Sequence, residues 1–184
     1  MKRNILIKLL EEYQPTEQEI GFKNDMLEFI KINEDCFERE LKIGHITGSA
    51  WLINKSGDQA LLMHHMKLDK WLQPGGHADG DTDILAVAIK EAQEESGIKA
   101  IEPVMNEIFD IDIHKIPTNS KDEAHFHYDV RFLLKVKSDE TLKINGEAKE
   151  LRWIGNKESL PTDEESVTRM FNKWINFFLL NEIK

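Results

Sequence analysis

Three glutamates close together in one short segment are the residues of this sequence best suited to chemistry. Glu91, Glu94 and Glu95 lie in segment 84–96, where apolar residues recur at the spacing of an amphipathic helix. Because a helix turns by about 100° per residue, side chains at positions i, i+3 and i+4 share one strip of its surface. Three carboxylates on such a strip are suited to holding a hard divalent cation such as Mg²⁺, Mn²⁺ or Ca²⁺.

The same strip is unfavourable for the stability of a bare helix. Like charges at these spacings repel by roughly a few tenths of a kcal/mol per pair. Glu94 and Glu95 also fall in the last turn, where the helix dipole disfavours anions by roughly 0.3–1 kcal/mol. Lys90 could offset part of this cost through an i, i+4 contact with Glu94, and a bound cation would reverse it. The alternative interpretation is a solvated acidic face, which three glutamates alone would favour.

A glycine-rich segment, 74–83, precedes the expected helix. Gly75 and Gly76 follow an expected strand that ends near Leu72, and they let the backbone approach a ligand closely, with N–H groups directed at phosphate oxygens. Gly80 permits a second turn before the helix. The candidates for the helix N-cap are Asp81, Thr82 and Asp83. A strand, a glycine loop and an acid-faced helix in this order predict a platform for a metal ion and a phosphate group.

Residues 76–98 resemble the Nudix box. The pattern of that box is G-x5-E-x7-R-E-U-x-E-E-x-G-U, where U is apolar, and this sequence keeps its spacing throughout its 23 residues. The matching residues are Gly76, Glu91, Ala92, Glu94, Glu95, Gly97 and Ile98. The resemblance implies a Nudix hydrolase, which cleaves a phosphoanhydride bond in a nucleoside diphosphate linked to another group and uses Mg²⁺ or Mn²⁺.

Two positions depart from the box. Thr82 stands where the pattern has Glu, and Lys90 stands where it has Arg. Lys keeps the positive charge but loses the planar fork that can hold a carboxylate at two points. Thr82 supplies no anion, although Asp81 or Asp83 could cap the helix in its place. These changes bear on fine positioning and on one outer metal contact, and they leave the three glutamates untouched.

The resemblance implies that all three glutamates are catalytic and bind metal. Glu94 and Glu95 are the first-choice metal ligands, and Glu91 is a third ligand or the base for the attacking water. We therefore expect Glu94→Gln and Glu95→Gln each to lower turnover at least ~100-fold while the fold survives. A fourth carboxylate could come from outside the box, and the sequence does not choose among its candidates. These are Glu123, Glu147 and Glu150.

Histidines and one tryptophan are the side chains that could contact a substrate. His125 and His127 alternate on an expected strand and therefore face one way, and His77 lies in the glycine loop. Three interpretations stay open for them: a transition-metal site, for which the spacing alone lacks a third fixed ligand, hydrogen bonding to a phosphate or base, or ordinary half-buried strand positions. Trp71 could stack on a base or be a core or rim aromatic. The expected substrate-binding residues are Trp71, Gly75, Gly76, His77 and His127.

The remaining elements form a mixed pattern of strands and a few helices. Residues 1–40 predict two helices, the second opened by a capping box at Thr16 and Glu19, and another capping box at Thr162 and Glu165 predicts a C-terminal helix with an apolar stripe. Strands are expected at 46–54, 60–66, 104–114, 125–136 and 150–154, with a polar loop at 118–123. Together with the resemblance, this order predicts an α/β (α+β) fold, a Nudix-like α/β/α sandwich with a mixed sheet. We expect an N-terminal helical extension at 1–40 and a Nudix domain at 41–184.

Composition and charge restrict the partners. The chain of 184 residues is 40% hydrophobic and carries a formal charge of −10, which repels nucleic-acid backbones and anionic membranes. Cys36 is the only cysteine, so no internal disulfide forms, as suits a reducing cytoplasm. The start does not resemble a signal peptide, and the longest apolar stretch, 174–180, is too short to span a bilayer. We expect a soluble cytoplasmic protein with a small nucleotide-like substrate, no general nucleic-acid or membrane binding, and a homodimeric assembly.

Three functions compete. The first is an active metal-dependent pyrophosphohydrolase, and the second is a non-catalytic Nudix-like module that binds a nucleotide for regulation. Loss of the central glutamates would indicate the second, and they are present. The third is a structural protein with an acidic face. Within the enzyme interpretation, sugar nucleotides such as ADP-ribose, dinucleoside polyphosphates, noncanonical triphosphates, coenzymes and capped RNA ends all stay open as substrates.

Overall fold

The computed structural model describes residues 3–118 and 123–181, with side chains up to residue 178. Most of the loop expected at 118–123, and the side chain of Leu179 in the expected apolar stripe, therefore lie outside the described residues. The helices are α1 (Asn4–Glu12), the 3-10 turn η1 (Glu17–Glu19), α2 (Ile20–Ile32), α3 (Ile84–Ser96) and α4 (Glu165–Asn181). The strands are β1 (Gly44–Ile53), β2 (Gln59–His65), β3 (Trp71–Leu72), β4 (Gly75–His77), β5 (Ile101–Pro103), β6 (Asp110–Ile116), β7 (His125–Val136) and β8 (Ala148–Gly155).

The strands form one mixed sheet with β1 at its centre. The order is β3-β2-β1-β7-β5, while β4 pairs with β1, β6 with β7 and β8 with β2. β1 and β7 run parallel in continuous register from Gly44↔Phe126 to Ile53↔Lys135, and the other pairs are antiparallel. This confirms the predicted mixed sheet. In place of the one strand expected at 104–114 there are two, β5 and β6. Each pairs with β7, and the chain departs from β7 between them.

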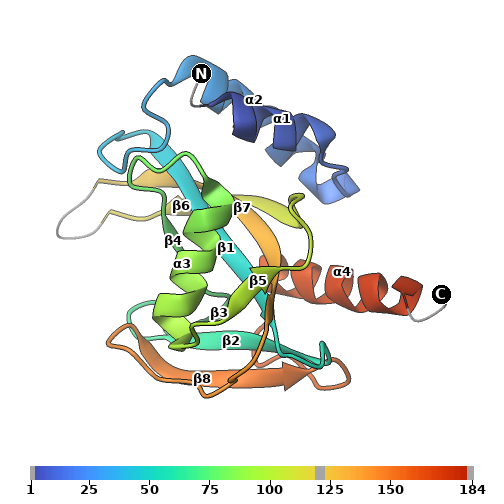
Figure 1. The fold of residues 1–184 in the computed structure, drawn as a ribbon. Coiled ribbons are helices and arrows are strands. Elements are labelled where there is room, and N and C mark those ends of the chain that lie inside the picture. Colours follow the sequence, from blue (N-terminus) through green and yellow to red (C-terminus); the bar gives the residue numbers. More distant parts are fainter. Residues whose placement is uncertain (1–2, 119–122, 182–184) are drawn as a thin grey trace.

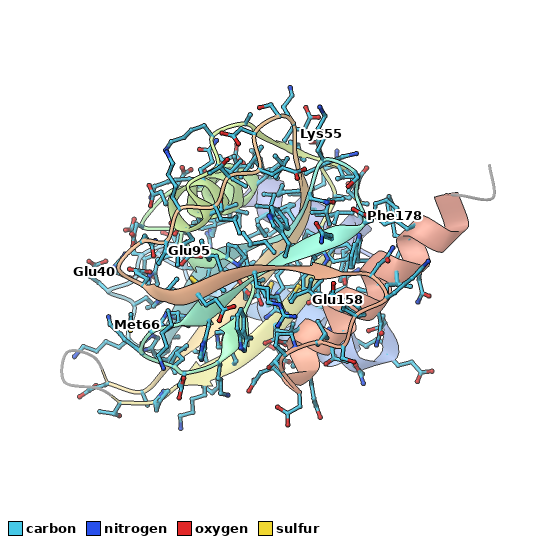
Figure 2. All side chains as sticks on the ribbon, turned by 90° about the horizontal axis from the view of Figure 1, so that it is seen from below. Glu40, Lys55, Met66, Glu95, Glu158 and Phe178 are labelled. Carbon is cyan, nitrogen blue, oxygen red and sulfur yellow. The ribbon has the colours of Figure 1, made fainter. Side chains whose placement is uncertain are left out.

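Helices cover both faces of the sheet. Figure 1 shows α3 in front of β1, and the view in Figure 2 places α3 and α4 on opposite sides of the strands. Alternate residues of β1 accordingly join different clusters: Ala50 and Leu52 pack in the cluster that includes α3, whereas Trp51 and Ile53 pack with Trp174 of α4. The α/β/α sandwich expected from the sequence is confirmed.

Two of the three helix caps expected from the sequence are present. Thr16 and Glu19 form the expected capping box, although it opens the 3-10 turn that leads into α2. Asp83 caps α3 by accepting a hydrogen bond from the Ala86 amide. The prediction of a capping box at Thr162 is wrong: α4 begins only at Glu165, so Thr162 lies too early and accepts from the Glu164 amide instead.

The N-terminal helices pack against the rest of the molecule at one end of the sheet (Figure 1). Leu6 and Leu10 of α1 and Met26 of α2 belong to the same buried cluster as Ile111 and Val130 of the sheet. This shared core means that α1 and α2 are in close contact with the sheet, while the division into domains at residue 40 stays a prediction. Among the helices described, none is both long and apolar enough to cross a membrane.

A buried ionic network adds to this contact. Glu19 accepts hydrogen bonds from the Tyr13 hydroxyl and the Lys173 ammonium, both at 2.5 Å. Lys173 also donates to Asp110 on β6, which is paired in turn with Arg131 on β7 at 3.0 Å. The carboxylates of Glu19 and Asp110 are fully buried. Charged contacts therefore link the N-terminal helices, α4 and the sheet.

Candidate metal and phosphoanhydride site

Helix α3 positions the three glutamates at different depths. Its Ala88 and Ala92 are fully buried, and these small side chains allow the helix to lie close to the sheet. Glu95 is 4% exposed, the Glu91 side chain is 16% exposed and the Glu94 side chain is 56% exposed. Glu95 lies between α3 and the strands in Figure 2. The structure thus directs Glu91 and Glu95 inward and leaves Glu94 at the rim.

The part of the glycine-rich segment that holds Gly75 and Gly76 is a strand rather than an open loop. β4 pairs with β1, in the register Gly75↔Ser49, Gly76↔Gly48 and His77↔Thr47. The Gly75 amide donates to the Glu95 carboxylate at 3.0 Å. It therefore holds Glu95 in place instead of pointing outward, which differs from the arrangement that the glycines alone suggested.

Gly76 makes room for Glu91. A Cβ atom at this position would lie 2.6 Å from the carboxyl carbon and from one carboxylate oxygen of Glu91. Carbon atoms do not approach so closely, so any side chain here would push the carboxylate away. Glycine is thus required at position 76 because the Glu91 carboxylate occupies the space of a side chain there.

Two carboxylates of α3, Glu91 and Glu95, have raised pKa values. Burial raises the pKa of Glu95 to about 8, the hydrogen bond from the Gly75 amide lowers it in part, and the charges of Glu91, Glu147 and Glu94 raise it further. Burial also raises the pKa of Glu91, against the neighbouring Lys90 ammonium. Among the candidates for a fourth carboxylate, Glu147 is the one whose charge acts on both Glu91 and Glu95.

Lys90 occupies the flank of this group. Its ammonium lies 3.6 Å from a Glu91 oxygen and 4.0 Å from a Glu94 oxygen. The predicted i, i+4 contact with Glu94 is present, and the lysine side chain is 62% exposed. It balances part of the negative charge without closing the group off from solvent.

A divalent cation fits these donors. Glu91 and Glu95 present hard carboxylate oxygens, which Mg²⁺ and Mn²⁺ prefer. Without a cation, the protein keeps Glu95 protonated at neutral pH, because burying an unpaired carboxylate is costly. A cation would offset this cost and the mutual repulsion of the carboxylates. The carboxylate donors and the raised pKa of Glu95 both favour a bound divalent cation.

Thr82, at the departure from the box, lies away from the glutamates. It precedes the N-terminus of α3 and lines a small cleft with Ile5, Leu6 and Leu9 of α1. The position that holds Glu in the box therefore lies across a small cleft from the N-terminal helix here, where a carboxylate would face apolar side chains.

Two expected substrate residues lie on the opposite face of the sheet. Gly48 and Gly76 face α3, since Cβ atoms there would meet Ile84 and Glu91. His77 follows Gly76 in the strand, and so its side chain alternates to the other side. There its ring centroid lies 5.0 Å from that of His127. The structure therefore brings His77 and His127 together, but not with the glutamates.

His45 is a member of this second group that sequence analysis missed. Its ring centroid is 5.0 Å from that of His77 and 4.8 Å from that of His127. The one available signal was its place directly before the strand expected at 46–54. The register that brings it beside His127 joins segments far apart in the sequence.

Trp71 is a partly buried aromatic at the edge of the sheet. It belongs to β3, packs against the cluster that contains Trp174, and stacks on His64 with ring centroids 5.0 Å apart. This placement matches the expected rim position, and His64 already covers part of the indole.

Replacing Gly76 tests the close contact with Glu91. We expect Gly76→Ala to lower kcat/KM for a phosphoanhydride substrate by roughly 10- to 100-fold, because displacing a catalytic group by about 1 Å has effects of that size. Steady-state kinetics and circular dichroism would measure activity and fold. Gly21→Ala is the control, since a Cβ there meets nothing within 4 Å. Equal activity of both variants would contradict the role given to Gly76.

Comparison with known proteins adds a family to this geometry. The family model described as NUDIX domain matches residues 44–175. An Ap4A hydrolase of C. elegans, solved as a binary complex, is 17% identical, with 73% of this chain and 97% of that chain covered and a TM-score of 0.54. A MutT NUDIX hydrolase from Burkholderia pseudomallei is 15% identical, with 71% of this chain and 97% of that chain covered and a TM-score of 0.55.

A third similar structure extends over the N-terminal helices. The crystal structure of a UDP-X diphosphatase is 14% identical, covers 97% of this chain and 92% of its own, and has a TM-score of 0.54. At these identities the likeness concerns the fold. The similarity thus includes α1 and α2, which lie outside the matched family region.

Proposed function

This chain belongs to the NUDIX domain family, and on that premise we propose that it hydrolyses a phosphoanhydride bond in a small nucleoside-diphosphate-linked compound with Mg²⁺ or Mn²⁺. The observation that carries the proposal is the pair of inward carboxylates, Glu91 and Glu95, seated against the glycines of β4. The carboxylates, the glycine strand and the box spacing all support hydrolysis. A binding module without catalysis would have no need of a buried carboxylate pair with raised pKa values.

The chain's own residues divide the work. Glu95 and Glu91 would hold the cation, with Glu94 at the rim and Glu147 nearby as further ligands. The cation supplies neutralisation of phosphate oxygens and activation of water. Glu91 either stays a ligand throughout or also acts as the base that takes the proton from the attacking water. The Gly75 amide keeps Glu95 oriented, and Lys90 screens the outer carboxylates.

The substrate would lie over the glycine strand and the end of α3. The Glu91 carboxylate fills the space above Gly76 and Ser49 fills that above Gly75, so a phosphate would meet the cation held by the carboxylates rather than the glycine backbone. Trp71, at the neighbouring edge, is the proposed contact for a base or sugar. His77 and His127 were expected to bind substrate as well, and their placement on the other face leads to a different assignment below. The proposed partner is thus a small nucleotide, and a homodimer in the cytoplasm stays a prediction.

A substrate panel tests the function. We would incubate the protein with Ap4A, ADP-ribose, UDP-sugars, noncanonical triphosphates and capped RNA, each with Mg²⁺ or Mn²⁺, and identify products by mass. The similar structures of an Ap4A hydrolase and an ADP-ribose pyrophosphatase motivate the first two compounds. We expect at least one compound to be cleaved and the cleavage to stop with a chelator. Binding of nucleotides without any metal-dependent turnover would favour the regulatory alternative.

Cation binding should depend on pH through Glu95. Because its pKa is raised to about 8 in the metal-free protein, a cation that binds below pH 8 must displace a proton. The apparent affinity should therefore rise by about tenfold per pH unit up to pH ~8 and level off above it. Calorimetric titration with Mn²⁺ in two buffers of different ionisation enthalpy would count the released proton. A flat profile below pH 8, or an unchanged slope in Glu95→Gln, would contradict the assignment.

A further inference from the structure

Five of the seven histidines gather on the sheet face opposite α3. His77 lies on β4, His45 on β1, His125 and His127 on β7, and His114 on β6. The register pairs His45 with His127 and His127 with His114, so three neighbouring strands place an imidazole at the same level. Side chains that are paired across strands point to the same face. The cluster is thus a cross-strand row, which no spacing along the sequence could reveal.

Three of these imidazoles converge. One ring nitrogen from each of His45, His77 and His127 lies within 4.8 Å of the other two. In tetrahedral coordination with Zn–N bonds of about 2.05 Å, ligand nitrogens are roughly 3.4 Å apart. Shifts of roughly 1 Å in the side chains would reach that spacing, which is within the freedom of a histidine side chain. The geometry therefore fits a preformed three-histidine site.

His45 is the most buried of these three histidines. It is 2% exposed, and neither of its ring nitrogens has a hydrogen-bond partner among the described residues. The neighbouring polar side chains on the same face are satisfied: Thr47 and Ser49 both donate to Asp129 at 2.8 Å, and Arg131 donates to Asp129 at 2.7 Å. A buried imidazole without a partner costs free energy comparable to a lost hydrogen bond. A ligand bond would remove that cost.

Hydrogen bonds of the outer histidines fix the available lone pairs. The Nδ1 atom of His125 lies 2.8 Å from the carbonyl oxygen of Glu123, which can only accept, so Nδ1 donates. In a neutral ring, His125 Nε2 is then an acceptor and receives the Nε2–H of His127 at 3.3 Å. This leaves the lone pair of His127 on Nδ1. Such an arrangement of second-layer hydrogen bonds is typical of metal-binding histidines.

We propose that His45, His77 and His127 bind a transition-metal ion of the Zn²⁺ type, in a site separate from the cation at the glutamates. Imidazole donors select Zn²⁺, Co²⁺ or Ni²⁺ over Mg²⁺, which prefers oxygen. The fourth position is open to water. The ion would tie β4 to β1 and β7. Because Gly75 of β4 orients Glu95, the ion also stabilises the strand on which the carboxylate site rests.

Cobalt is the probe that reports this site directly. We would strip the purified full chain with chelator, add excess Mg²⁺ to saturate the carboxylates, and titrate with Co²⁺ while recording visible absorption. We expect one equivalent of Co²⁺ to give the intense d–d band of a four-coordinate nitrogen site, and one equivalent of Zn²⁺ to abolish it. Elemental analysis of the unstripped protein should find zinc near one atom per chain.

Variants separate this site from the rest of the chain. His77 is half-buried on a three-residue strand, so His77→Gln should keep the fold. It should weaken Co²⁺ binding at least about 100-fold, because losing even a second-layer partner lowers metal affinity by roughly 10- to 100-fold. His45→Gln and His127→Gln should have the same effect, provided circular dichroism finds them folded. His64→Gln, a histidine outside the cluster, and Glu95→Gln should leave the band unchanged.

The proposal fails under either of two results. The first is the absence of a stoichiometric Co²⁺ band in wild-type protein under Mg²⁺. The second is a band that survives in folded His77→Gln or disappears in Glu95→Gln, which would assign the ion to other ligands. Because the readout is binding and not turnover, inactivity across the substrate panel would overturn the proposed hydrolase without affecting this site.

Discussion

Glu95→Gln is expected to lower kcat/KM for the phosphoanhydride substrate at least about 100-fold while the protein remains folded. The substitution keeps the size of the side chain and can still accept from the Gly75 amide, but it removes the negative charge that a cation would bind. Steady-state kinetics at saturating Mg²⁺ would give the activity. Since the wild-type carboxyl group is already protonated near neutral pH in the metal-free state, the neutral amide should not lower stability.

Stability measurements sharpen this prediction. Binding of a cation to the folded state stabilises it by RT ln(1 + [L]/Kd), so Mn²⁺ should raise the melting temperature of wild-type protein. Glu95→Gln should lose this increase while keeping the wild-type melting temperature without metal. Glu28→Gln, on the exposed side of α2, is the matched control and should behave as wild type. Full turnover in folded Glu95→Gln would contradict the assigned site.

The sequence predicted α3 and its box well because their signals are local. Asp83 and Gly97 bound the helix as expected, and the left-handed φ of 76° at Gly97 is one that glycine adopts without strain. The depth of each glutamate was not predictable. Glu94 and Glu95 are neighbours on the same strip, and the rotation of α3 about its axis, set by Ala88 and Ala92 against the sheet, decides which one is buried.

Local sequence patterns could not predict the glycine strand or the histidine cluster. Gly75 and Gly76 suggested a loop because glycine is typical of turns, whereas pairing with Gly48 and Ser49 makes the segment a strand. His45 and His127 meet only through the parallel register of β1 and β7. A parallel pair needs a long connection, so its register depends on packing of the intervening chain rather than on any turn between the strands.

The N-terminal helices are the other place where distant residues decide the outcome. The expected capping box at Thr16 and Glu19 is formed, yet the same Glu19 side chain also bonds Lys173, 154 residues away. A single carboxylate thus completes a local turn and an inter-element ion pair. Because Glu19 is fully buried, it has no access to solvent as a substitute partner. Its charge is therefore much more important than that of an ordinary cap.

Glu19→Gln is accordingly expected to lower the free energy of unfolding at pH 7 by about 3 kcal/mol or more, the size typical of breaking a buried ion pair. Burial alone would raise the pKa of Glu19, but hydrogen bonds from Lys173, Thr16 and Tyr13 outweigh it and lower the pKa to about 2. A depressed pKa stabilises the folded state above the ordinary value of 4.5, and this contribution disappears as the pH falls from 4.5 to about 2. Guanidinium unfolding at pH 7 and at pH 3 would measure both effects.

The control separates this charge from the helix itself. Glu17 lies in the same turn η1 but is exposed, so Glu17→Gln should change the free energy of unfolding by less than ~0.5 kcal/mol. The difference between wild type and Glu19→Gln should also narrow toward pH 3, where the carboxylate begins to lose its advantage. If Glu19→Gln matched Glu17→Gln at pH 7, the network would not hold the N-terminal helices, and apolar packing of Leu6, Leu10 and Met26 would be their main attachment.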